Sequence, residues 1–204
     1  LIKIFMVVCL FSTLSGQHDP NARPTHSGGP LSPEQASYDV RTYKLDLNID
    51  PGERSINGTL TVEADVLQSL EWLVLDLDPA LEVSSVYFVA EELSPLAFER
   101  RSTQIWIQFP ESRQPGQTIQ VQVAYHGSPK IAPRPPWIGG FVWRTDSSGN
   151  PWIGVACQLD GADLWWPCKD HPSDKPDRMD LRITVPIPLA VAANGVLKRM
   201  TEYE

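Results

Sequence analysis

The chain has 204 residues, a formal net charge of −8 at pH 7, 42% hydrophobic residues and 21% charged residues. A chain of this length can bury a sizeable core, so it requires neither disulfides nor a metal to fold. The negative charge and the lack of a Lys and Arg cluster argue against a phosphate-binding surface, so we expect no nucleic-acid partner.

Residues 1–16 have the layout of a secretory signal peptide. Lys3 is their only charge, an apolar stretch covers residues 4–14, and small residues follow. The stretch is too short to anchor the protein in a bilayer. We therefore expect a secreted or periplasmic protein that has no membrane contact after signal removal. The alternative for this segment is a buried N-terminal strand.

Residues 17–37 are polar and rich in Pro, Gly, Ser and His, which predicts a flexible leader. The folded domain is expected to cover residues 38–204, with its last part slightly incomplete.

From Tyr38 onward apolar and polar residues alternate, as expected for strands with one buried face. The alternation is clearest at residues 43–49, 60–66, 73–77, 105–109, 119–125 and 181–185. Turn signals separate these runs at residues 50–52, 57–58, 78–79, 114–116 and 148–151. The 19 prolines leave little room for helix. The sequence therefore predicts an all-β fold, a twisted antiparallel β-sandwich or saddle of two sheets with roughly ten to twelve strands.

Residues 129–150 combine prolines and glycines with Trp137, Phe141 and Trp143. Aromatic side chains on a proline-stiffened loop face a partner or ligand in many proteins. The same loop could instead fold over its own core, and the sequence does not decide between these two interpretations.

Residues 157–177 form the densest run of unusual residues, CQLDGADLWWPCKDHPSDKPD. Cys168, Asp170 and His171 lie too close together for a usual zinc site, and adjacency does not make Cys168 and His171 a nucleophile pair. The prolines favour a rigid turn that leads into the strand at 181–185. Cys157 and Cys168 are the two cysteines outside the signal peptide, and they could form a disulfide or remain buried thiols.

This run resembles a signature of the N-terminal domain of the aminopeptidase N family of zinc metallopeptidases, which includes leukotriene hydrolase, and its secreted bacterial-type branch in particular. Other pieces follow in family order: residues 38–47, Ile56-Asn57-Gly58-Thr59, Gly140-Phe141-Val142-Trp143 and Asn194-Gly195-Val196-Leu197. The resemblance implies an exopeptidase that removes N-terminal residues from peptides with a bound zinc ion. It also implies that Gln158 helps to bind the substrate's N-terminal end, and that the small Gly161 and Ala162 let the substrate approach.

The family's His-Glu-x-x-His and Gly-x-Met-Glu-Asn motifs are absent from this sequence. The chain is therefore expected to hold no catalytic residue, no metal ligand and no cofactor, and to be inactive alone. Zinc would belong to the full-length parent, whose catalytic domain is the expected partner of this domain, together with peptide N-termini.

The leading hypothesis is thus the non-catalytic N-terminal domain of a zinc aminopeptidase that forms part of the substrate cleft. The alternative is a free-standing secreted β-sandwich binding module, for a carbohydrate or a cell-surface partner. A third possibility is that the sequence is a gene fragment, whose activity belongs to a longer product.

Overall fold

The computed structural model describes residues 30–158 and 160–202. The predicted signal peptide and most of the predicted leader lie outside these residues. The described chain forms eleven strands and two short 3-10 turns, which confirms the all-β prediction and the low helix content. No helix among the described residues has the length and apolar character needed to cross a membrane.

The largest layer is a six-stranded sheet with strand order β11-β1-β2-β8-β4-β5. Its strands are β1 (Tyr38–Asp50), β2 (Ser55–Val66), β4 (Leu81–Val89), β5 (Leu93–Pro95), β8 (Thr118–Gly127) and β11 (Arg178–Thr184). Neighbouring strands are antiparallel except β1 and β11, which pair in parallel. The parallel pair differs from the purely antiparallel prediction. It forms because the chain returns to β1 through the long segment before β11 rather than through a hairpin.

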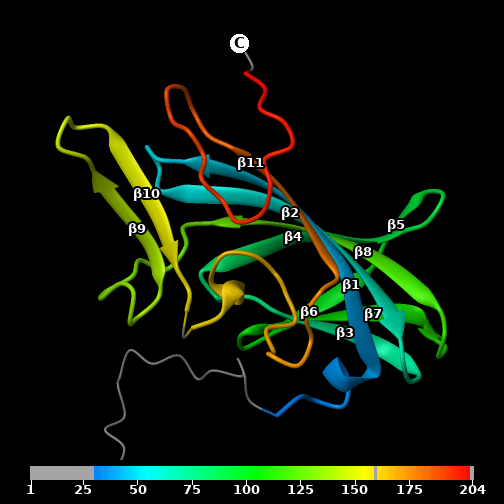
Figure 1. Ribbon diagram of the computed structural model, residues 1–204. Coiled ribbons are helices and arrows are strands. Elements are labelled where there is room, and N and C mark those ends of the chain that lie inside the picture. Colours follow the sequence, from blue (N-terminus) through cyan, green and yellow to red (C-terminus); the bar gives the residue numbers. More distant parts are fainter. Residues whose placement is uncertain (1–29, 159, 203–204) are drawn as a thin grey trace, which may run out of the picture.

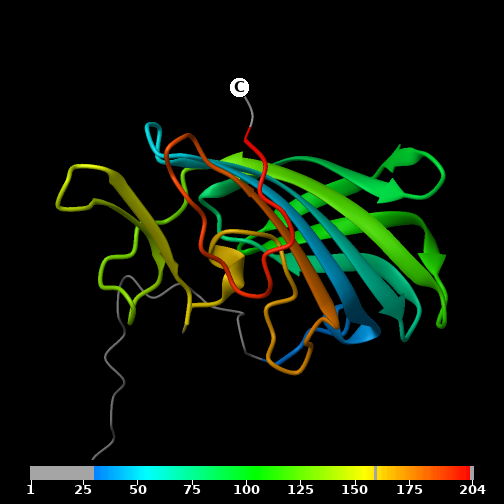
Figure 2. The same ribbon diagram turned by 45° about the horizontal axis from the view of Figure 1, so that its top comes forward.

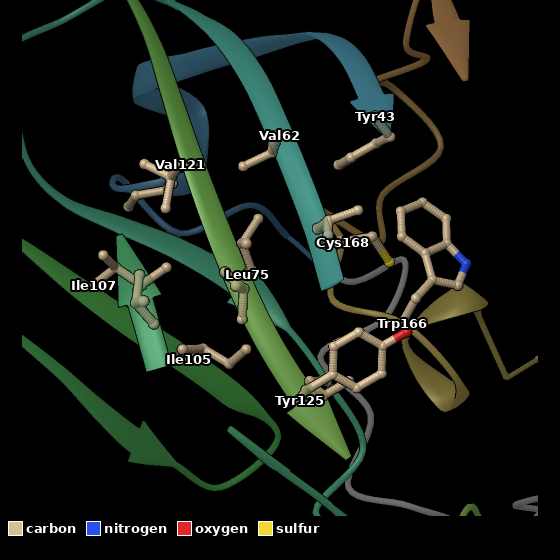
Figure 3. Packing of buried hydrophobic residues seen from close by; sticks show 14 of the residues in the cluster. Tyr43, Val62, Leu75, Ile105, Ile107, Val121, Tyr125, Trp166 and Cys168 are labelled. Carbon is tan, nitrogen blue, oxygen red and sulfur yellow. The ribbon is translucent and has the colours of Figure 1, made fainter. Parts of the chain in front are cut away.

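A three-stranded sheet, β3-β7-β6, forms the second layer. It contains β3 (Leu70–Asp76), β6 (Ala97–Arg101) and β7 (Gln104–Arg113). Apolar side chains of the two sheets meet in one core, as Figure 3 shows for Val62 and Val121 of the large sheet and Leu75, Ile105 and Ile107 of the small one. All five are at most 1% exposed. The predicted sandwich is therefore present, and the predicted alternation supplies its core.

A third, two-stranded sheet corrects the prediction of two sheets. It is the hairpin of β9 (Gly140–Thr145) and β10 (Pro151–Ala156), which projects to one side of the larger sheets (Figure 1, Figure 2). Phe141 is fully buried in the main core, whereas Trp137 is 62% exposed. The interpretation of a loop that folds over its own core is thus correct for Phe141, whereas contact of Trp137 with a partner or ligand stays a prediction.

The predicted turn at Asn57 and Gly58 is wrong, because both residues lie inside β2. A β-carbon on Gly58 would lie 2.4 Å from the ring of Tyr125 on the neighbouring strand β8. Gly58 is needed here because the tyrosine ring occupies the space of a side chain, and the sequence cannot distinguish this from a turn glycine.

The packed region also begins before the predicted boundary at Tyr38. Residues Gln35–Ser37 form the 3-10 turn η1, and Gln35 is only 6% exposed. Its amide donates a hydrogen bond of 2.9 Å to the carboxylate of Asp76 at the end of β3. A polar stretch looks like a leader in the sequence, but a buried hydrogen bond of this kind fixes its last residues to the fold.

Candidate functional site

The run that stands out in the sequence closes one end of the sandwich. We call residues 157–177 the closing segment; Leu159 within it lies outside the described residues. Asp76 at the end of β3 and Cys168 exchange two backbone hydrogen bonds of 2.6 and 3.0 Å. On the other sheet, the Tyr125 hydroxyl donates to the Trp165 carbonyl at 2.9 Å. The segment therefore joins the two large sheets.

Trp166 fills the space that these hydrogen bonds enclose. It is 6% exposed, and its ring meets Tyr43 edge-on with centroids 4.8 Å apart. Figure 3 shows Trp166, Cys168, Tyr43 and Tyr125 gathered at this end of the core. Burial raises the pKa of the Tyr43 and Tyr125 hydroxyls, so both remain protonated.

The charged residues of the segment form a buried structural network. Lys169 Nζ lies 2.5 Å from Asp174 Oδ2, and both side chains are 4% exposed. Lys169 Nζ also donates to the Tyr38 carbonyl at 2.7 Å, and the Asp174 carboxylate accepts the backbone N–H of Val40. Lys169 and Asp174 thus pair with each other and with backbone groups of β1, so neither side chain is available to a substrate.

Gln158 lies on the loop that starts the segment, immediately after β10. The loop is closed by a hydrogen bond from Gly161 N–H to the Cys157 carbonyl at 3.0 Å. Gln158 is exposed, and the described residues offer its side-chain amide no hydrogen-bond partner. An amide can accept a hydrogen bond from an ammonium group and donate one to a carbonyl. Gln158 is therefore chemically able to bind a ligand.

Gly161 and Ala162 follow directly and are both half-buried. Gly161 has φ +93°, and a β-carbon on it would lie 1.7 Å from Asp170 Oδ2. The same carboxylate accepts the Ala162 N–H at 3.4 Å. The small residue at 161 thus makes room for Asp170 within the protein, and its role toward a substrate stays a prediction.

Two carboxylates hold this loop in place: Asp170, which the sequence offered only as a poor metal-ligand candidate, and Asp160, which it did not single out. Asp170 contacts Gly161 and Ala162, as described above, and its own N–H donates to Asp76 Oδ2 at 3.1 Å. Asp160 accepts the Gly139 N–H at 2.7 Å, which ties the loop to the residues before β9. Aspartates in a polar stretch suggest only a solvated turn, so the sequence held no signal for these contacts.

Both cysteines of the segment are reduced thiols, and its histidine contacts a serine. No disulfide joins Cys157 and Cys168. Burial, reinforced by the Asp170 carboxylate, raises the pKa of the Cys157 thiol, which keeps it protonated near neutral pH. The ring of His171 lies against Ser173, with 2.7 Å between Nδ1 and Oγ.

The described residues contain no group of three or more His, Cys, Asp and Glu side chains that could hold a metal ion. Asp76, Asp170 and Asp174 are instead engaged by backbone N–H groups or by Lys169. The residues present thus do not fit a zinc site, and no step of a zinc-dependent reaction can be assigned to them.

Solved structures that are similar to this chain include zinc metallopeptidases and an LTA4 hydrolase. The M1 zinc metallopeptidase of Deinococcus radiodurans shares 26% identity with a TM-score of 0.66, over 82% of this chain and 37% of that one. A mutant of it bound to a Tyr-Ser-Ala substrate shares 27% identity with a TM-score of 0.67, over 82% and 37% of the two chains. Yeast LTA4 hydrolase, at 19% identity and a TM-score of 0.61 over 84% of this chain and 26% of its own, shows likeness of fold alone.

The chain therefore spans less than two fifths of the length of the metallopeptidases that it matches. No curated protein sequence matches it. Residues 39–204 match the family described as the Peptidase M1 N-terminal domain. This match covers most of the sequence and includes the whole closing segment and the Gln158 loop. The chain belongs to the Peptidase M1 N-terminal domain family.

Proposed function

We propose that this domain is the substrate-side part of an exported zinc aminopeptidase, and that Gln158 binds the N-terminal end of the peptide. The observation that carries the proposal is the exposed, unpartnered amide of Gln158 on a loop that two carboxylates hold in place. A loop that is anchored by such contacts and presents a hydrogen-bonding group is a typical arrangement for substrate positioning.

The chemistry proposed for Gln158 is recognition of a free amine. Its carbonyl oxygen would accept a hydrogen bond from the substrate ammonium, and its N–H would donate to a substrate carbonyl. Since a hydrogen bond to a charged group contributes about 1.5–3 kcal/mol, its loss would lower kcat/KM by roughly 10- to 100-fold.

The remaining parts of the active site would come from the rest of a longer polypeptide. Zinc bound there would polarise the scissile carbonyl and activate water. Support for this division is that the matched metallopeptidases are more than twice as long as this chain. The proposal of export to a secreted or periplasmic location is supported by residues 1–16 of the sequence, with their single Lys3 and apolar stretch.

The test is an assay of the full-length gene product on aminoacyl amide substrates, with zinc and after chelation. We expect zinc-dependent release of the N-terminal residue, no turnover by the 204-residue chain alone, and a higher KM for Gln158→Ala. Gln68→Ala is the matched control, because Gln68 is an exposed glutamine in the turn between β2 and β3.

Two results would overturn the proposal at different levels. A full-length product that cleaves no aminoacyl substrate would exclude the aminopeptidase function. A full-length enzyme whose kcat and KM are the same for wild type, Gln158→Ala and Gln68→Ala would leave the reaction in place and exclude the role of Gln158.

A further inference from the structure

The outer face of the six-stranded sheet carries a polar hollow, which no side chain of the closing segment lines. Its volume is about 420 Å³, and it is lined by Asp46, Leu47, Asn48, Asn57, Thr59, Gln122, Arg182 and Thr184. This volume lies within the range of roughly 300–1,000 Å³ that is usual for small-molecule sites.

Strand alternation and register place these side chains on one face. Asp46 on β1 pairs with Thr59 on β2 and with Arg182 on β11. The residues beside them in sequence, such as Leu45 and Leu60, are buried in the core on the opposite face. The hollow is therefore built on three adjacent strands and Gln122 of a fourth, whose positions the sheet fixes.

Two residues further along β1, the neighbouring side chains on β1, β2 and β11 are uncharged hydrogen-bonding groups. Asn48 pairs with Asn57 on one side and with Thr184 on the other. Thr59 faces Ala124 on β8, and this small residue leaves space next to Gln122. The hollow forms where short side chains lie between longer amides.

The charges of the hollow cancel. The guanidinium of Arg182 pairs with the carboxylate of Asp46 through two of its nitrogens. The lining contains no other charged residue and no aromatic one. The hollow is thus neutral and polar, which disfavours an anionic polymer and a large apolar ligand alike.

The amides and hydroxyls of the hollow differ from the polar side chains next to them on β2 and β8, Glu63, Asp65, Thr118 and Gln120. Elsewhere on this face Gln120 donates to Glu63 and Thr118 donates to Asp65, so these side chains are paired within the sheet. The side chains of Asn48, Asn57, Gln122, Thr59 and Thr184 have no hydrogen-bond partner among the described residues. These five side chains leave hydrogen-bond donors and acceptors in the hollow for solvent or a ligand.

We propose that this hollow binds a neutral oligosaccharide. Neighbouring hydroxyls of a sugar each donate and accept hydrogen bonds, and a side-chain amide presents a donor and an acceptor in one plane. Asn48, Asn57 and Gln122 supply three such groups, Thr59 and Thr184 add hydroxyls, and the Asp46–Arg182 pair supplies a charged acceptor and donor without net charge. The site is independent of Gln158 and of the proposed peptidase.

The test is a titration of the ¹⁵N-labelled chain with neutral oligosaccharides of glucose, mannose, galactose and N-acetylglucosamine. We expect saturable shifts of the side-chain NH₂ signals of Asn48, Asn57 and Gln122 with at least one series. The double change Asn57→Ala and Gln122→Ala removes two hydrogen-bonding groups, so it is expected to weaken binding about tenfold or more.

Gln120→Ala is the matched control, because Gln120 is an amide on the same strand and face that does not line the hollow. The Gln120→Ala variant should bind the oligosaccharide with the affinity of the wild type. Thermal melts should show that all variants fold. The single changes Gln122→Ala and Thr184→Val repeat the test if the double variant does not fold. Absence of saturable shifts with all four series, equal weakening by Gln120→Ala, or binding of acidic polysaccharides alone would each overturn the proposal.

Discussion

At the scale of single residues, Lys169 and Asp174 form a buried ion pair in which each charge depends on the other. Their charged atoms are 2.5 Å apart and both side chains are 4% exposed. Removing one partner leaves the other charge buried, so Asp174→Ala should lower the free energy of unfolding by about 3–5 kcal/mol. Urea unfolding monitored by tryptophan fluorescence measures this difference. The double variant Lys169→Met and Asp174→Leu removes both charges and should be less destabilising than Asp174→Ala. If Asp174→Ala lowered the free energy of unfolding by less than about 1 kcal/mol, the buried pairing would be contradicted.

Gly161 is the second residue whose identity the structure requires. Its φ of +93° is a region that side chains rarely adopt, and its missing β-carbon makes room for Asp170 Oδ2. Gly161→Ala should therefore destabilise the protein by more than the roughly 1–3 kcal/mol of backbone strain alone. Gly149→Ala is the control, since Gly149 has φ +87° with nothing within 4 Å of its β-carbon position. Equal losses in chemical denaturation for the two variants would show that Asp170 adapts without cost.

At the scale of elements, the end of β3 is where the layers meet. Asp76 is 3% exposed there and accepts hydrogen bonds from Gln35, Gln104 and the Asp170 N–H. Burial nevertheless raises the pKa of its carboxyl above the ordinary value of 3.8. A raised pKa in the folded state means that protonation favours folding. The resulting stabilisation is complete below 3.8 and is lost as the pH rises through the folded-state pKa.

Asp76→Asn tests this pH dependence. The variant cannot titrate at this position, and its NH₂ group faces hydrogen-bond donors, so it should be less stable than the wild type throughout. The difference in unfolding free energy between wild type and Asp76→Asn should narrow as the pH rises from about 4 to about 7. The reason is that only the wild type loses the stabilisation that a protonated Asp76 provides. Unfolding in urea at several pH values measures the gap. A gap that widens with pH would mean that the folded-state pKa of Asp76 is lowered.

At the scale of the whole molecule, apolar side chains remain exposed around the β9–β10 hairpin. Ile131, Trp137 and Trp152 are 57%, 62% and 56% exposed. Large apolar residues that are exposed on one part of a protein are typical of interaction surfaces. In the proposed full-length enzyme, this side of the domain is therefore a candidate for contact with other parts of the chain.

Replacing Trp137 and Trp152 with Ser should reduce binding of a hydrophobic dye, yet change the unfolding free energy by about 0.5 kcal/mol or less, because neither ring is buried. Trp166→Ala is the contrasting variant, since that ring is 6% exposed and its loss should cost about 3–5 kcal/mol. Dye fluorescence and urea unfolding provide the two readouts. A large loss of stability from the Trp137 and Trp152 changes would show that these rings support the fold.

The sequence predicted the strands with strong alternation and missed those without it. β1, β2, β7 and β8 contain runs identified by period two, and the runs at β3 and β11 extend one residue beyond the strand. β4, β5, β6, β9 and β10 were not identified individually, because edge and hairpin strands carry mixed exposure and weak alternation. The Asn57–Gly58 dipeptide shows the same limit, since a glycine that makes room for Tyr125 has the same sequence signature as a turn.

By itself the sequence determined the fold class, the family and the importance of residues 157–177, because these depend on local periodicity and on a long specific motif. Only the tertiary structure decided what the motif does. It shows that Lys169, Asp170 and Asp174 are structural, that Gln158 is exposed, and that Asp160 ties the loop to Gly139. It also shows that no disulfide joins Cys157 and Cys168, and that a neutral hollow lies on the outer face of the six-stranded sheet. These features depend on contacts between residues far apart in the chain, and such contacts leave no pattern in the local sequence.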